Sequence, residues 1–170
     1  MNFICSLKKI YTQMKPTVFN KQLPIAIGCD HAGYECKEEI RKQLSAAGWQ
    51  VEDKGTYSHA SVDYPDFAHP VAEMVASGKA SVGVLICGSG NGVCMTANKH
   101  DGVRAALAWN EEVAILSRQH NNANVICVPS RFVSNQVALK MVDDFLSSPF
   151  EGGRHERRIE KINKFEHEVV

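Results

Sequence analysis

Short apolar runs alternate with segments of helical periodicity along most of this chain. The runs have the length of buried strands, and they cover residues 23–29, 49–53, 82–87, 103–109 and 124–128. Strands that alternate with helices predict βαβ units, in which a parallel sheet is joined by right-handed crossovers. The pattern therefore predicts an α/β protein with a parallel sheet of five strands.

The segments between the runs have the spacing of amphipathic helices. Ile40 and Leu44 lie one turn apart in the first helix, which Gly48 is expected to end, and Val71 and Val75 share one face of the second. Ser134 has the side chain and the position of an N-cap for a later helix. Helices are thus expected over 33–48, over 67–77, up to residue 99, over 111–119, after Ser134 and from about 153 onward.

Length, charge and cysteine content narrow the class of protein. A chain of 170 residues suits one compact domain, which we assign to residues 23–170, and residues 1–22 form an extension that is disordered or serves targeting. The 19 basic and 19 acidic residues cancel, so no overall field attracts nucleic acid, and no apolar run is long enough to span a membrane. Six cysteines without a metal-binding spacing indicate reduced thiols, a cytoplasmic location and no metal site.

The strongest local signal is the segment ICGSGNG over residues 86–92, between a predicted strand and a predicted helix. Three glycines there let the backbone turn sharply and present N–H groups to an anion. Cys87 stands just before this turn, where a thiolate is favoured, so it is a candidate base or nucleophile. The spacing of the glycines fits neither the dinucleotide-binding fingerprint nor the P-loop, so nucleotide binding is disfavoured. Close packing of the helix against the strand would explain a glycine-rich turn equally well.

Other candidate side chains lie at strand ends and in the last helix. Asp30 and His31 follow the first strand and could bind hydroxyls or a phosphate, although an Asp that caps the next helix is an equal alternative. His120 precedes the fifth strand. Arg154 and Arg158 lie four residues apart, a spacing that suits a phosphate clamp or a solvated helix with internal ion pairs.

Taken together, the motifs GCDHAG, DKGT, DYPD, LICGSGNG, TANK, SRQHNNANV and PFEGGRHERR closely resemble those of the type B ribose-5-phosphate isomerase family. The resemblance covers about residues 23–165 and includes relatives that act on galactose 6-phosphate and allose 6-phosphate. It implies a Rossmann-like three-layer α/β/α sandwich and an aldose–ketose isomerase of the pentose phosphate pathway. It also implies that no metal or organic cofactor is needed.

The resemblance further assigns roles to individual residues. It implies that Cys87 moves a proton between carbons one and two through a cis-enediolate, while Ser89 and the amides of the glycine loop hold the oxyanion. His120 would open the furanose ring with help from Asp30 and Tyr64. The implied substrate contacts are His31, Tyr64, Gly88, Gly90, Asn91, Gly92, Asn121, Arg131, Arg154 and Arg158.

Family members are homodimers, sometimes tetramers, with the site at the subunit interface, and the same assembly is expected here. Two other functions stay open at this point. A hexose 6-phosphate could be the substrate, because the same groups can move a proton on a longer sugar. A non-catalytic, phosphate-binding module of flavodoxin type is the alternative in which Cys87 is dispensable.

Overall fold

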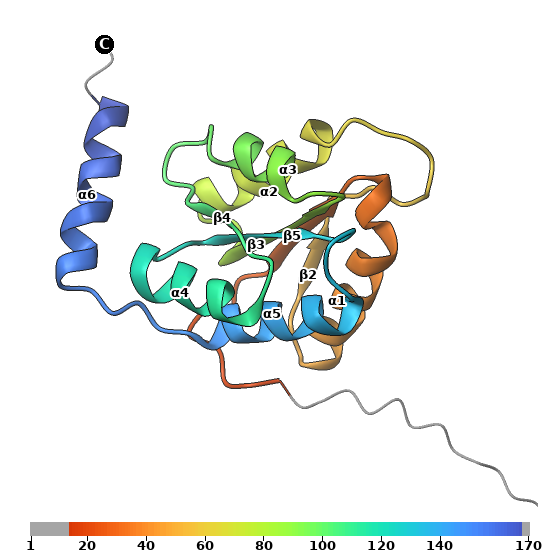
Figure 1. Cartoon of the computed structure of the whole chain (residues 1–170), viewed down its shortest axis with the longest axis horizontal. Coiled ribbons are helices and arrows are strands. Elements are labelled where there is room, and N and C mark those ends of the chain that lie inside the picture. Colours follow the sequence, from red (N-terminus) through yellow and green to blue (C-terminus); the bar gives the residue numbers. More distant parts are fainter. Residues whose placement is uncertain (1–13, 168–170) are drawn as a thin grey trace, which may run out of the picture.

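Five parallel strands form one sheet in the computed structural model, which describes residues 14–167 and the side chains of residues 14–163 (Figure 1). The order across the sheet is β2-β1-β3-β5-β4. The predicted fold class and the predicted number of strands are confirmed. In chain order the strands are β1 (Ile25–Cys29), β2 (Val51–Asp53), β3 (Val82–Cys87), β4 (Ala105–Leu107) and β5 (Val125–Pro129).

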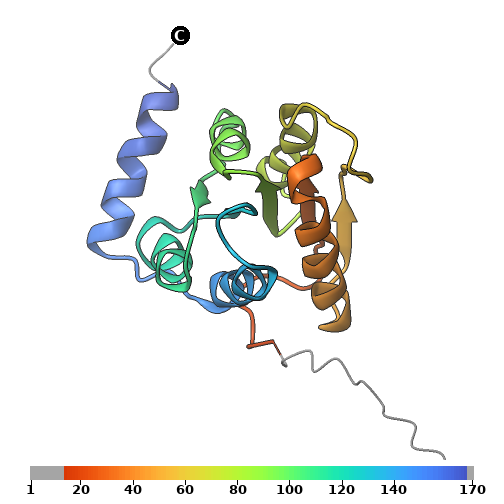
Figure 2. The ribbon, with the colours of Figure 1, turned by 45° about the vertical axis from the view of Figure 1, so that its right-hand side comes forward.

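Helices cover both faces of the sheet, which gives the predicted three layers (Figure 1). One face carries α1 (Tyr34–Ala46), α4 (Glu111–Asn121) and α5 (Asn135–Ser147), and the other carries α2 (Pro65–Ala76) and α3 (Asn91–Ala97). A short 3-10 turn, His31–Gly33, joins β1 to α1. The last helix, α6 (Arg154–His167), packs against α4 and stands at the side of the molecule, away from the sheet (Figure 2).

The alternation of side chains along each strand explains the two cores. In β3, Val84 and Ile86 pack with α1 and α5, whereas Leu85 and Cys87 point to the face covered by α2 and α3. Both faces are apolar because a parallel sheet is covered on both sides. The last side chain of β3, a thiol, is therefore directed toward the start of α3.

The ends of the elements differ slightly from the predicted ones. β4 is only three residues long and half-buried because it is an edge strand of the sheet. Ser134 caps α5 as predicted, since its side chain accepts the N–H of Val137, and Gly48 follows α1 with a φ of +82°. No helix among residues 14–167 is long and apolar enough to cross a membrane.

Part of the predicted N-terminal extension contacts the body of the protein. The N–H of Val18 and the hydroxyl of Thr17 both donate to the carbonyl of Leu146 at 2.9 Å. The ring of Phe19 stacks on Phe145, with 6.0 Å between the ring centroids. Residues 17–19 therefore lie against α5, and residues 1–13 of the extension are outside the described part of the chain.

Candidate active site

A hollow opens at the edge of the sheet where β1 and β3 end. Its volume is about 380 Å³. We call it the strand-end hollow. Ligands of open parallel sheets bind outside the carboxyl ends of the strands, so this is the expected place for a site. Each of its lining residues belongs to the set that the sequence predicts: Asp30, His31, Tyr64, Cys87, Gly88, Ser89, Gly92 and Arg131.

Cys87 forms part of the wall of this hollow with only 4% of its surface exposed. The N–H of Gly90 donates to its sulfur at 3.1 Å. A donor aimed at the sulfur stabilises negative charge there more than it stabilises a neutral thiol. This backbone position requires glycine for two reasons. The φ of Gly90 is +74°, which other residues rarely adopt, and any other side chain would place a Cβ 2.4 Å from Cδ1 of Leu107.

The glycine loop uses some of its own donors. The N–H of Asn91 donates to the hydroxyl oxygen of Ser89 at 3.3 Å, and that of Gly90 is bound to the sulfur of Cys87. These two amides can donate to a substrate oxyanion only if they give up their present acceptors. Ser89 itself is exposed at the rim of the hollow, where its hydroxyl can reach a bound molecule.

Asp30 and His31 fix the backbone beside Cys87. The carboxylate of Asp30 accepts the N–H groups of Ala32 and Gly33 at 2.9 and 3.0 Å, so the capping alternative is what the structure shows, although Asp30 also lines the hollow. Nδ1 of His31 accepts the N–H of Val62 at 3.3 Å, which leaves Nε2 as the protonated nitrogen of the neutral ring. Both side chains are thus oriented before any ligand binds.

The loop after β5 is joined to the glycine loop. The N–H of Ser130 donates to the carbonyl of Cys87 at 3.0 Å, its hydroxyl donates to the carbonyl of Ala32 at 3.0 Å, and the N–H of Arg131 donates to Gly88 at 3.1 Å. The guanidinium of Arg131 lies over Gly88. A Cβ added at Gly88 would be only 3.1–3.2 Å from three side-chain atoms of Arg131. Arg131 therefore places a positive charge over the glycine loop in the wall of the strand-end hollow.

Tyr64 closes another side of the hollow. Its ring lies on Gly92, where a Cβ would come within 2.6–2.9 Å of three ring atoms. The loop that leads to Tyr64 is anchored by Lys37, a fully buried side chain paired with the carboxylate of Asp53 at 2.6 Å. That carboxylate also accepts the N–H of Gly55. A buried ion pair thus holds the start of the segment that ends in Tyr64.

Four predicted site residues lie elsewhere. His120 and Asn121 end α4, and Arg154 and Arg158 begin α6, which stands to the side of the chain (Figures 1 and 2). None of the four lines the strand-end hollow. One chain therefore does not bring Cys87 and the two arginines to a single cavity.

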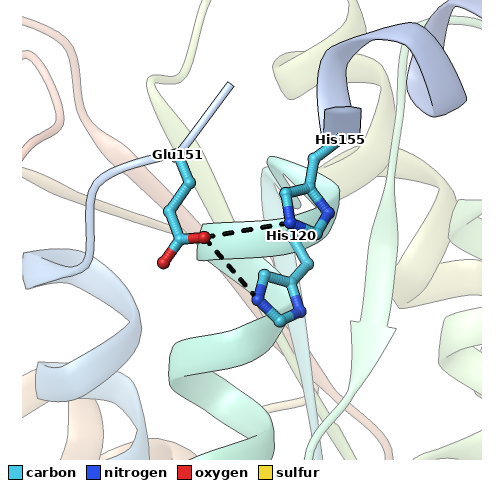
Figure 3. A group of neighbouring side chains, drawn as sticks. All are labelled: His120, Glu151 and His155. Atoms are coloured by element: carbon cyan, nitrogen blue, oxygen red, sulfur yellow. Dashed lines mark ion pairs between the residues drawn. The ribbon is translucent and has the colours of Figure 1, made fainter. Parts of the chain in front are cut away.

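His120 has two partners that the sequence reasoning missed, Glu151 and His155 (Figure 3). Their side-chain ligand atoms lie within 4.8 Å of one another, which makes them the group of described residues that could hold a metal ion. Burial lowers the pKa of His155, and the nearby His120, Arg154 and Arg158 lower it further. The spacing of Glu151 and His155 is not a helical signal, because Glu151 lies in the loop before α6.

The model of the Ribose/Galactose Isomerase family matches residues 25–162. The chain belongs to this family. Among curated relatives, it is 51% identical over 147 residues to the probable ribose-5-phosphate isomerase B of Mycoplasma genitalium, a match that spans 85% of this chain and 97% of that protein. It is 46% identical to the ribose-5-phosphate isomerase B of Escherichia coli, across 84% of this chain and 95% of the relative.

Solved structures of the ribose/galactose isomerase family have the same fold. The ribose-5-phosphate isomerase B of Mycoplasma genitalium with bound ribulose-5-phosphate superimposes with a TM-score of 0.85 at 49% identity, covering 88% of this chain and all of that one. The Clostridium thermocellum enzyme of the same name gives 0.85 at 44% identity, over 87% of this chain and 100% of the other. The three-layer fold is therefore that of the family.

The remaining thiols of this family member differ from Cys87 in their surroundings. Burial raises the pKa of Cys29 and of Cys36 to about 12. Cys94 lies on α3 and is half-buried, and a hydrogen bond with Cys127 lowers its pKa, whereas burial raises that of Cys127. The five cysteines within residues 14–167 form no disulfide.

Proposed function

We propose that this protein interconverts D-ribose 5-phosphate and D-ribulose 5-phosphate. The observation that carries the proposal is the thiol of Cys87 in the wall of the strand-end hollow, with the N–H of Gly90 directed at its sulfur. Support also comes from the names of the relatives and from the Mycoplasma genitalium structure with bound ribulose-5-phosphate. A single thiol base is sufficient for this chemistry because the reaction only moves protons.

Cys87 is proposed to transfer the proton between carbons one and two. As thiolate, it takes the proton from C2 of open-chain ribose 5-phosphate, which leaves a cis-enediolate, and it returns the proton to C1 while the hydroxyl proton of O2 moves to O1. General base catalysis of this kind contributes about 10²- to 10⁴-fold to the rate. Ser89 and the loop amides would stabilise the enediolate oxygens, at about 3–4 kcal/mol for a well-placed donor.

The phosphate and the sugar ring are assigned to the other predicted residues. Arg154 and Arg158 would hold the phosphate as a charge-assisted clamp, with His31 and Arg131 as further contacts. His120 would open the furanose ring. Asp30 and Tyr64 are proposed to assist ring opening, and Asn121 to contact the enediolate oxygens.

We propose that a second copy of the chain completes the site. The strand-end hollow of one chain contains the base but not His120, Arg154 or Arg158, and α6 stands apart at the side of the chain (Figure 2). A homodimer with two shared sites satisfies both observations. The proposed compartment is the cytoplasm, where the five described thiols stay reduced.

Complementation between two inactive variants tests the shared site. Cys87→Ala and His120→Ala are each expected to have little activity, but a heterodimer of the two contains one intact site. Random pairing of co-expressed chains should therefore restore about a quarter of the wild-type activity. A mixture that forms heterodimers and stays inactive would refute the sharing and would leave the reaction itself in place.

The substrate is tested by comparing kcat/KM for ribose 5-phosphate and for allose 6-phosphate. Ribose 5-phosphate is expected to be preferred by at least about tenfold, because the binding energy of the phosphate orients the reacting carbons only when the chain length fits. A clear preference for the hexose phosphate would replace the proposed substrate. Binding of both sugars without turnover would favour the non-catalytic alternative.

A further inference from the structure

A carboxylate connects two stacked imidazole rings where α6 meets α4. The rings of His120 and His155 have centroids 4.2 Å apart and planes inclined by only 3°. Oε2 of Glu151 lies 3.8 Å from Nε2 of each ring (Figure 3). The strand-end hollow does not include this cluster, and the proposed reaction uses only one of its members.

Backbone contacts fix the position of Glu151. Its N–H donates to the carbonyl of Gln119 at 3.0 Å, one residue before His120 on α4. Gly152 and Gly153 follow with φ values of +66° and +57°, a turn that glycine adopts readily, and the N–H of His155 donates back to Gly152 at 3.1 Å. The chain thus returns over the end of α4, and the carboxylate is held against the ring of His120 by the main chain.

The two imidazoles are not equivalent. His155 has a side chain only 7% exposed, and its Nε2 accepts a hydrogen bond from Nε of Arg154 at 3.3 Å. That nitrogen therefore carries no proton. Burial, together with the positive charges of Arg154 and Arg158, keeps the pKa of His155 low, so His155 is neutral near pH 7. His120 is 36% exposed and is the more accessible of the two rings beside Glu151.

Two imidazoles and one carboxylate are also a frequent zinc ligand set. Here the geometry disfavours that use, because the in-plane lone pairs of two parallel rings cannot both point at one ion. The lone pair on Nε2 of His155 is moreover taken up by Arg154. The arrangement instead places a carboxylate 3.8 Å from the accessible ring of His120.

We propose that Glu151 is a positioning residue for His120 in the opening of the sugar ring, an inference that rests on the ring-opening role in the proposed function. In that step His120 takes the proton of the anomeric hydroxyl, the bond between C1 and the ring oxygen breaks, and His120 returns the proton to the ring oxygen, which becomes the C4 hydroxyl. His120 is transiently an imidazolium. The carboxylate of Glu151 stabilises that charge, and the neutral ring of His155 stacks on it without repulsion.

A kinetic isotope effect separates this role from a structural one. Deuterium at C2 of ribose 5-phosphate slows the proton transfer by Cys87 but does not slow the opening of the ring. A defect in ring opening alone should therefore lower the isotope effect on kcat toward one, whereas a general defect in the site leaves it unchanged or raises it.

The test compares full-length Glu151→Gln with Glu156→Gln, a matched change at an exposed position of α6, the helix that follows Glu151. Supporting groups of this kind change activity by about 10- to 100-fold, so Glu151→Gln should lower kcat on ribose 5-phosphate by at least about tenfold. We expect KM to stay within about twofold and the isotope effect of C2-deuterated ribose 5-phosphate on kcat to fall toward one. Glu156→Gln should behave as wild type in both measurements, and all assays contain a chelator.

A double-mutant cycle with His120→Ala shows whether Glu151 acts through His120. Glu151→Gln should have almost no additional effect in the His120→Ala background. An isotope effect that stays at the wild-type value in Glu151→Gln, or an equal effect of Glu151→Gln with and without His120, would overturn the inference. If His120→Ala lowers the isotope effect and Glu151→Gln does not, the inference fails and the proposed function stands. If His120→Ala leaves the isotope effect unchanged, the ring-opening role fails as well.

Discussion

A methyl group added at Gly90 should damage both stability and catalysis. Gly90 has a φ of +74°, and its N–H is the donor to the sulfur of Cys87. In Gly90→Ala the new Cβ would lie 2.4 Å from Cδ1 of Leu107 and 3.2 Å from the backbone nitrogen of Pro129. The side chain of Leu107 can move, but the backbone of β5 cannot, so the loop must shift away from the thiol.

The cost has two parts that a control variant separates. A non-glycine residue in the left-handed region costs about 1–2 kcal/mol, and overpacking adds about 1–3 kcal/mol. Gly90→Ala should therefore lose about 2–5 kcal/mol of the free energy of unfolding. Gly102 has a similar φ of +76° with no atom within 4 Å of a Cβ, so Gly102→Ala should lose only the first part, about 1–2 kcal/mol.

Urea unfolding at one fixed protein concentration measures both free energies, and kcat on ribose 5-phosphate measures the effect on the site. We expect Gly102→Ala to retain the wild-type kcat, because that turn lies outside the strand-end hollow. Gly90→Ala should lose most of its turnover. Equal stabilities of the two variants, with unchanged turnover in Gly90→Ala, would refute the role given to the loop.

Two further predictions concern binding and thiol reactivity. Arg154→Ala removes a charge-assisted phosphate contact and should raise KM for ribose 5-phosphate by about tenfold or more while kcat changes little, whereas an unchanged KM would show that Arg154 is only surface charge. Iodoacetamide at pH 8 should leave Cys29 and Cys36 of the native protein unmodified. Their pKa of about 12 leaves only about one thiol in ten thousand ionised. Mass spectrometry that finds them modified as quickly as in urea would contradict their burial.

Much of the fold followed from local patterns in the sequence. Runs such as 82–87 identify buried strands, and the alternation with helices specifies a parallel sheet whose loops meet at one edge. That is sufficient to predict that Asp30, Cys87 and Arg131 lie together. The ends of β4 were harder to predict. This strand is short because it has a neighbouring strand on one side only, and its place at the edge of the sheet cannot be read from the local sequence.

The arrangement of the site was predictable only in part. Sequence motifs identify the arginines of α6 but not the direction in which that helix leaves the body, which depends on a turn at Gly152 and Gly153 and on packing against α4. The pairing of Glu151 with His120 was also out of reach. It depends on a main-chain hydrogen bond between a loop and the end of a helix that are 32 positions apart in the chain.

The most direct test of the account is the turnover of ribose 5-phosphate by Cys87→Ala and Cys87→Ser in the presence of a chelator, with calorimetric binding of the sugar phosphate measured in parallel. The account predicts that kcat falls by at least about 100-fold in both variants, since the base is lost. The dissociation constant should stay within about threefold, because the phosphate contacts remain. Turnover close to that of the wild type in either variant would contradict the claim that this sulfur moves the proton.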